Sequence, residues 1–294
     1  MILQDLLAKF DSIDQDNSYL YFITRVLKND FRKNSKVLDK YEFKVYQIDI
    51  NDDIREHLYM LTQEQLTHLI HKRSELHEYD VITDDTAVLF SYSMVNKAMS
   101  FSDVVNNQLK SAPPKVSSLE NIIQSEELWA YCVGFQCDET DWIYTFRKIL
   151  AGKVAVDEQN NNSRGKISKF IRTTFNTKNQ KLELLEGDTI NLDKQIDCIF
   201  YIDTFYIAKK TQFEQIIGLE EEFKEQAIVV VDELAATNMI DGADVLKNEI
   251  LANPSIHKKL VRLSKIGNYK DLDAKAIRAM QKICKRYGDN LKIK

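Results

Sequence analysis

The sequence predicts an α+β protein. We expect an antiparallel β-sheet with a C-terminal helical block, preceded by a smaller N-terminal α/β region. Short apolar and aromatic runs between residues 128 and 207 are separated by connections too short for parallel crossovers, which indicates antiparallel strands. From Phe213 onwards the apolar residues follow the 3.6-residue period of a helix. A sheet followed by helices is typical of α+β organisation.

The N-terminal region begins with a short amphipathic helix over residues 3–10. Aromatic and β-branched residues then predict strands at 19–27 and 41–50. Asp52 or Asp53 caps a long helical region that extends to about Tyr79. A further strand at 87–91 and a helix at 101–109 complete this region.

The best boundary in the chain is Ser111–Ser118, which contains two of the three prolines. It divides the sequence into an N-terminal α/β region (1–118) and a second region (119–294) that contains the antiparallel sheet and the C-terminal helices.

The second region opens with a pair of strands at 128–135 and 142–146. Further strands are expected at 166–175, 196–201 and 205–207, and helices at 223–236, 245–251, 256–266 and 274–287. Thr211 is placed to cap the helix that Phe213 begins. On the helix at 256–266 the expected apolar stripe is Ile256, Leu260, Leu263 and Ile266. On the last helix it is Ile277, Met280, Ile283, Cys284 and Tyr287.

Composition excludes several classes of protein. The chain has 294 residues and a formal net charge of −5, and it has no apolar run of the ~20 residues that a membrane span needs. Its four cysteines lie in apolar or amphipathic segments, which favours a reduced, cytoplasmic protein without a metal. We expect no cofactor, because the glycines are too scattered to build a phosphate-binding loop.

Basic residues are concentrated in two stretches, although the whole chain is acidic. Such segregation can create a local positive field that attracts nucleic acid. Since neither stretch contains a base-reading motif, binding should be largely independent of sequence. Solvated faces neutralised by acidic neighbours are the alternative. The candidate nucleic-acid-binding residues are Arg164, Lys166, Lys169, Phe170, Arg172, Lys178, Lys181, Lys258, Lys259 and Arg262.

Signals for catalysis are weak. Glu42-Phe43-Lys44, with Asp30 upstream, fits the Glu-x-Lys pattern of Mg²⁺-dependent nucleases. The same type of triplet recurs at Glu222–Lys224 and Asp273–Lys275, as expected by chance in a highly charged chain. Glu64, His68 and His71 could share a helical face, but the HEXXH pattern of zinc proteins is missing. Nucleophile and Walker motifs are also missing, so the sequence indicates no catalytic residues.

The pattern over residues 129–265 resembles the conserved domain of the KwaB family, the soluble component of the bacterial Kiwa anti-phage defence system. The residues that carry the resemblance are GDTINLDKQIDCIFYIDTFYIAKKTQFEQIIGLEEEF and, more loosely, ILANPSIHKKLVRLSKIG.

This resemblance implies a defence protein that binds duplex DNA and forms a homodimer or a higher homo-oligomer. It also implies docking on the membrane protein KwaA, which would recruit a cytoplasmic chain to the inner face of the cell membrane. A Mg²⁺-dependent nuclease effector and a protein-only adaptor are the alternatives.

Overall fold

The computed structural model describes residues 2–28, 41–73, 75–83, 87–95, 100–117, 119, 122, 125–149, 154–155, 173–176, 181–184, 189–190, 192, 195–236, 240, 242–267, 270, 275 and 278–279. The chain forms two compact units. The sheet unit contains residues 1–78 and 86–217, and the helical unit contains residues 79–85 and 218–294.

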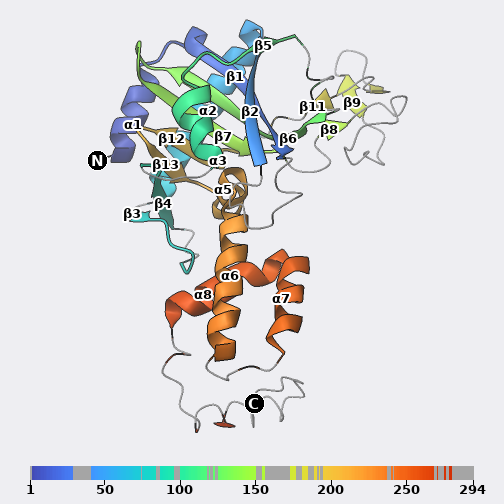
Figure 1. The fold of residues 1–294 in the computed structure, drawn as a ribbon. Helices are drawn as coiled ribbons and strands as arrows, with labels where there is room; N and C mark the ends of the chain where they lie inside the picture. Colours follow the sequence, from blue (N-terminus) through green and yellow to red (C-terminus); the bar gives the residue numbers. More distant parts are fainter. Residues whose placement is uncertain are drawn as a thin grey trace. The chain divides into compact units, whose positions relative to one another are not determined.

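A nine-stranded mixed sheet forms the centre of the sheet unit (Figure 1). Its strand order is β3-β4-β13-β12-β7-β6-β1-β2-β5. Neighbours are antiparallel except β2 with β5 and β3 with β4, which are parallel. The strands are β1 (Ser18–Leu27), β2 (Tyr41–Ile48), β3 (Glu75–Glu78), β4 (Val88–Ser93), β5 (Lys115–Val116), β6 (Glu127–Gln136), β7 (Trp142–Lys148), β12 (Cys198–Tyr201) and β13 (Thr204–Ile207).

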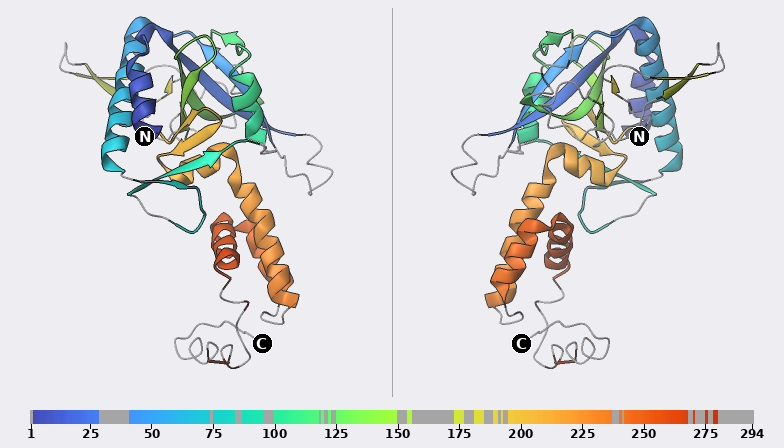
Figure 2. Two further views of the ribbon diagram at one scale, coloured as in Figure 1. Left: turned by 90° about the vertical axis from the view of Figure 1, so that its left-hand side faces the viewer. Right: turned by 90° about the vertical axis from the view of Figure 1, so that its right-hand side faces the viewer.

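One face of this sheet packs against two helices, α1 (Ile2–Asp11) and α2 (Asp52–Lys72), which lie side by side in Figure 2. Between α1 and β1 there is one turn of 3₁₀ helix, η1 (Gln15–Asn17). Phe10 of α1 is fully buried, stacks on Tyr59 of α2 and contacts Phe135 of β6 edge-on. Because successive residues of a strand point to opposite faces, Leu20 and Phe22 of β1 face the same core.

The other face is covered by α3 (Ser100–Asp103), the π-helical turn η3 (Val104–Gln108) and α5 (Lys210–Ile217). Phe213 of α5 is fully buried, as its place at the start of the helical stripe predicted, and its ring contacts Phe205 and Tyr92. The expected cap at Thr211 is wrong. The helix begins at Lys210, so Thr211 lies inside it; the amide of Phe213 donates to the carbonyl of Lys209, and Thr211 is exposed.

Two further ladders of two strands lie between β7 and β12 in the sequence. They pair β8 (Val154–Ala155) with β11 (Thr189–Ile190), and β9 (Thr173–Asn176) with β10 (Lys181–Leu184). The strand predicted at 166–175 is therefore described only from Thr173, and its first part lies outside the described residues.

The predicted α+β class is confirmed, with helices at the C-terminus. The compact units divide the chain at residue 217, whereas the boundary expected near residue 118 falls inside the sheet unit. The reason is strand pairing, since β1 from the N-terminal region pairs along most of its length with β6 from the second region.

The helical unit consists of α6 (Leu219–Ala236), α7 (Ala243–Ala252) and α8 (Pro254–Ile266), together with residues 79–85. Ala227, Val231 and Ile250 form its core. His257 of α8 is buried beside them, and its Nε2 lies 2.6 Å from the carbonyl oxygen of Ile250.

Candidate nucleic-acid interface

Strand ends from distant parts of the sequence meet at one end of the nine-stranded sheet. There β1, β7 and β13 finish, and β6 and β12 begin. We call it the cationic end of the sheet because it gathers Arg25, Arg147, Lys148 and Lys209. The chain between 149 and 196 also leaves and re-enters the sheet here, after β7 and before β12.

Trp129, near the start of β6, is the aromatic centre of this end. The Arg25 guanidinium and the Lys148 ammonium each lie 3.3 Å from the centre of its ring. Arg25 also forms an ion pair with Glu127 at 2.7 Å. The indole nitrogen of Trp129 donates a hydrogen bond of 3.0 Å to the carbonyl of Ile216, which fixes α5 to the sheet. A cation over an aromatic face is attracted by the ring quadrupole, so Trp129 stabilises two charges in a partly dry environment.

Asp197 is the buried carboxylate of the cationic end, with 4% of its surface exposed. One of its oxygens accepts the backbone amide of Lys148 at 2.7 Å, and the other lies 3.3 Å from the ammonium of Lys209. Its carbonyl accepts the amides of Ala208 and Lys209. Asp197 thereby ties β7, β12 and the start of α5 together at the point where the chain re-enters the sheet.

The buried cations of this end have structural contacts. Lys148 donates to the carbonyls of Trp129 and Ile149 at 2.8 and 3.1 Å. Arg147 is fully buried, donates to the hydroxyl of Thr145 at 3.0 Å and lies over the ring of Tyr131. Lys209 is partly exposed. Among the four cations that define this end of the sheet, it is therefore the best placed to face a ligand in solvent.

A second polar cluster on the sheet surrounds Glu126, which directly precedes β6. Its carboxylate accepts hydrogen bonds from Lys44 at 2.6 Å, from Tyr46 at 3.2 Å and from the hydroxyl of Thr24. Burial opposes ionisation of Glu126, but the hydrogen bonds from Lys44 and Thr24 outweigh it, and the pKa of Glu126 is lowered. Glu126 is therefore a paired carboxylate at neutral pH.

This cluster bears on the nuclease alternative. Lys44 of the Glu42-Phe43-Lys44 triplet pairs with Glu126, while Glu42 is exposed and Asp30 lies outside the described residues. Glu64, His68 and His71 are exposed on α2. Within the part of the chain that the structure describes, no three His, Cys, Asp or Glu side chains come together as metal ligands.

The opposite end of the sheet is acidic. It carries η1, the connection from β2 to α2, and the hairpin turns after β6 and β12. The acidic residues of these connections are Asp14, Asp16, Asp49, Asp138, Glu139, Asp141 and Asp203. Lys9 of α1 pairs with Asp138 and Asp141 at 3.2 and 3.1 Å. Hydrogen bonds from the amides of Asp141 and Thr140 help to lower the pKa of Asp138 to about 2. These connections are therefore richer in carboxylates than the cationic end, where Glu126, Glu127 and Asp197 pair with Lys44, Arg25 and Lys209.

Most of the candidate residues from the first basic stretch lie outside the described residues. These are Arg164, Lys166, Lys169, Phe170, Arg172 and Lys178. Lys181 is the first residue of β10. All seven belong to the chain between 149 and 196, whose two ends lie at the cationic end of the sheet.

The other three candidates are on α8, where the structure separates their roles. Lys259 is exposed and Lys258 is partly buried. The Nε of Arg262 donates a 2.7 Å hydrogen bond to the carbonyl of Val81, a residue with 1% of its surface exposed. Arg262 therefore holds the segment around Val81 against the helix, and Lys259 remains the candidate best placed for phosphate.

The apolar stripe expected on α8 is partly wrong. Leu263 and Ile266 are 36% and 50% exposed, whereas Val261 and His257 are buried. The helix is rotated relative to the expectation because α6 packs against the side that carries Val261 and the backbone of Val81 binds Arg262.

Sequence reasoning missed Arg25, Arg147, Lys148 and Lys209. A usable signal existed for three of them. Arg147-Lys148 follows Phe146 at the end of one strand, and Lys209 follows shortly after Ile207 at the end of another. Basic residues at the ends of antiparallel strands meet when those ends are at the same side of the sheet. The pairing of β7 with β12 and of β12 with β13 supplies that condition.

A family model described as "Kiwa protein KwaB-like" matches residues 125–294. Searches of curated proteins and of solved structures found no match. The matched range includes Glu126, Trp129, Lys148, Asp197 and all of α8, and it covers more than half of the sequence. The chain therefore belongs to the KwaB-like family, which points to a role in Kiwa anti-phage defence.

Proposed function

We propose that this KwaB-like chain acts in Kiwa anti-phage defence by binding duplex DNA with little sequence preference. The observation that carries the proposal is the position of the basic stretch 164–181 in the chain between residues 149 and 196, since the two ends of that chain lie at the cationic end of the sheet. The carboxylates at this end, Glu126, Glu127 and Asp197, are paired with Lys44, Arg25 and Lys209, whereas the connections at the opposite end are rich in Asp. Such a distribution of charge favours approach of a polyanion at the cationic end.

The physical basis is phosphate neutralisation. A duplex that gains several Lys and Arg contacts releases condensed counterions, and this release supplies most of the affinity. In the sheet unit Lys209 is an accessible cation, and the basic residues of 164–181 extend the set. Lys259 is an accessible cation of the helical unit. The set contains no predicted recognition helix, so its contacts position the duplex without reading bases.

The proposal includes a membrane partner and self-association. Membership of the KwaB-like family supports action together with the membrane protein KwaA, assembly as a homodimer or higher homo-oligomer, and a cytoplasmic location with recruitment to the inner face of the membrane. No helix among the described residues has the length and apolarity to cross a bilayer.

The test is a gel-shift series with the full-length protein and two duplexes of unrelated sequence, at salt concentrations from ~50 to ~200 mM. We expect equal affinity for the two duplexes and a linear fall of log affinity with log salt, amounting to a few decades over this range. A parallel incubation with Mg²⁺ should leave the DNA intact. Absence of binding at low salt would contradict the proposal and favour the protein-only adaptor, and cleavage would favour the nuclease.

Charge variants test which end of the sheet unit binds DNA. Lys166→Ala with Arg172→Ala should weaken binding and reduce the salt slope, since each lost phosphate contact lowers that slope by about one. The matched control is Glu139→Gln at the acidic end, which should leave affinity unchanged or raise it slightly. Equal losses of DNA affinity in both variants would refute the assignment of DNA binding to the cationic end.

A further inference from the structure

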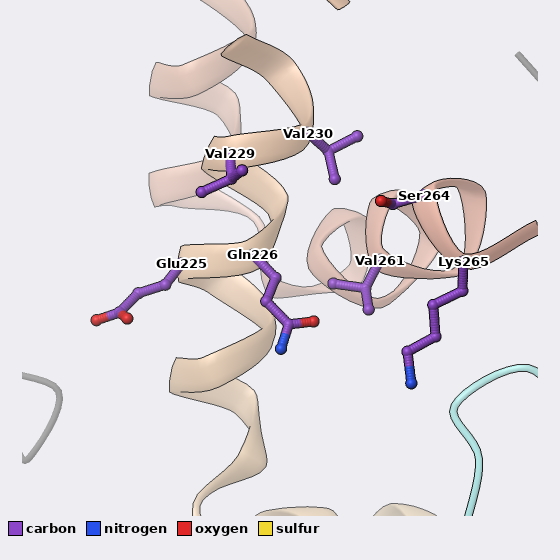
Figure 3. A pocket seen from close by; sticks show the side chains of 7 residues that line it. All are labelled: Glu225, Gln226, Val229, Val230, Val261, Ser264 and Lys265. Carbon is purple, nitrogen blue, oxygen red and sulfur yellow. The ribbon is translucent and has the colours of Figure 1, made fainter. Parts of the chain in front are cut away.

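A groove lies between α6 and α8 on the surface of the helical unit (Figure 3). It encloses about 380 Å³, and all the residues that line it belong to these two helices. Figure 3 shows Val229 and Val230 of α6 across from Val261 of α8. Val230 and Val261 are buried, but Val229 is 56% exposed. The groove therefore has an apolar floor and an apolar residue on its α6 flank that remains in contact with solvent.

The α6 flank of the groove is acidic. Four carboxylates share one side of the helix with Val229, because they recur at intervals of three or four residues. The whole helix carries six Asp and Glu against one Lys. Val229 is therefore an exposed apolar residue among carboxylates. The four are Glu222, Glu225, Asp232 and Glu233.

The C-terminal part of this flank already binds cations from elsewhere in the helical unit. Two lysines reach it, one from α7 and one from the chain after α8. The pairs are Lys247 with Asp232 at 2.5 Å and Lys270 with Glu233 at 3.9 Å. Ammonium groups thus fit against this side of α6.

Glu222 and Glu225 form the N-terminal part of the flank, and Glu225 lines the groove itself. The carboxylate of Glu222 is exposed and accepts a hydrogen bond of 2.9 Å from the amide of Gln226. That donor is neutral, so the bond does not cancel the negative charge of Glu222. An occupant of the groove therefore meets negative charge on the α6 side.

The α8 flank has a different character. Lys265 is exposed and lines the groove together with Ser264, so this side presents a hydroxyl and a cation. Bringing like charges together at an interface costs free energy, and opposite charges fix the register of a partner. The groove therefore matches an occupant that has cations on one side of an apolar stripe and none on the other.

We propose that this groove binds an amphipathic helix from a partner protein, with an apolar stripe that is flanked on one side by Lys or Arg. Its apolar side chains pack on Val229 and on the floor of the groove, as in other helix-in-groove complexes, and its cations meet Glu222 and Glu225. Duplex DNA and anionic membrane surfaces do not match, because both bring negative charge against the α6 carboxylates. This inference does not rest on DNA binding.

Fluorescence anisotropy with the full-length protein tests the proposal. The probe is a dye-labelled peptide of about 15 residues, long enough to form a helix when bound. It carries a stripe of Leu with Lys on one side and Gln on the other. We expect saturable binding to the parent chain, and a second peptide with Glu in place of Lys should not bind.

Variants then assign the binding to the groove. Val229→Gln should weaken binding of the Lys peptide about tenfold, because it removes an apolar contact. Glu222→Gln with Glu225→Gln should weaken binding and remove most of its salt dependence. The matched control is Val245→Gln on α7, since Val245 is 68% exposed beside Asp244 but does not line the groove. This control should bind like the parent.

Three results would overturn the proposal. They are absence of binding to the parent chain, equal affinity for the Lys and Glu peptides, and an equal loss of affinity in Val229→Gln and Val245→Gln. Light scattering of the same variants adds a fourth. If Val229→Gln lowered the molar mass of the protein in solution, the occupant would be a second copy. Circular dichroism should give the same helix content for all variants, since Val229, Glu222 and Val245 are exposed and Glu225 is only partly buried.

Discussion

Phe213 shows how one side chain joins a helix to the sheet. It is fully buried between Phe205 of β13 and Tyr92 of β4, at ring distances of 5.4 and 5.5 Å. Aromatic pairs in edge-on contact add stabilisation beyond the buried area. The residue therefore fixes the position of α5, whose last turn accepts the hydrogen bond from Trp129.

Phe213→Ala should lower the free energy of unfolding of the sheet unit by about 3–5 kcal/mol, since it removes buried area and leaves a cavity. Tryptophan fluorescence during denaturant unfolding measures this unit specifically, because both tryptophans, Trp129 and Trp142, belong to it. Thr211→Ala is the control. Thr211 is exposed and inside the helix, so its loss should change stability by under about 0.5 kcal/mol.

Glu126 makes stability depend on pH. Its folded-state pKa is lowered, so its contribution is present above the unfolded-state pKa, ordinarily 4.5, and is lost as pH falls through the folded-state value. Glu126→Gln should therefore destabilise the protein at pH 7, and the difference from the parent should shrink below about pH 4.5. Denaturant unfolding at pH 7 and at pH 3.5 measures both differences. A difference that stays constant across this range would show that the carboxylate charge is not involved.

At the scale of elements, α8 combines a structural and a solvent-facing side. Its buried side carries Val261 and His257, and Arg262 binds the backbone carbonyl of Val81. Its exposed side carries Lys259 and Leu263. The basic residues that the sequence grouped together on this helix are therefore not equivalent.

Arg262→Ala should lower the stability of the helical unit by about 1–2 kcal/mol, because it removes a hydrogen bond from a charged donor to a buried carbonyl. Hydrogen exchange of the α8 amides should accelerate accordingly. Lys259→Ala, one turn earlier, should leave exchange unchanged and weaken DNA binding modestly. If Arg262→Ala reduced DNA affinity without affecting exchange, Arg262 would be a phosphate contact instead.

At the scale of the whole molecule, the family match and the folding unit do not coincide. The match begins at residue 125, directly before β6, but β6 pairs on one side with β7 and on the other with β1. Residues Ala130–Phe135 of β6 are buried in the complete sheet. A fragment without β1 would expose this apolar strand as a sheet edge, which promotes aggregation.

Residues 125–294 expressed alone should therefore be insoluble or should lack the cooperative thermal unfolding of the full chain. Co-expression with residues 1–124 should restore a soluble complex, since β1 and β2 would again complete the sheet. Solubility and a thermal melt by circular dichroism test both statements. A soluble, cooperatively folding fragment would show that β1 is dispensable.

The sequence by itself determined the local elements. Runs of aromatic, apolar and β-branched residues identified β1, β2, β6, β7, β12 and β13, and the change of period at Phe213 identified the helical C-terminal part. The resemblance over residues 129–265 agrees with the family match. These predictions succeeded because periodicity depends only on neighbouring residues, which decide between a strand and a helix.

Only the tertiary structure decided which elements are neighbours. The pairing of β1 with β6 joins residues about a hundred positions apart, and no local pattern encodes that choice. The gathering of Arg25, Lys148 and Lys209 at one end of the sheet follows from it. The burial of Val261 rather than Leu263 on α8 has the same origin. The side of a helix that is buried depends on what packs against it, and here that is α6 and the segment around Val81.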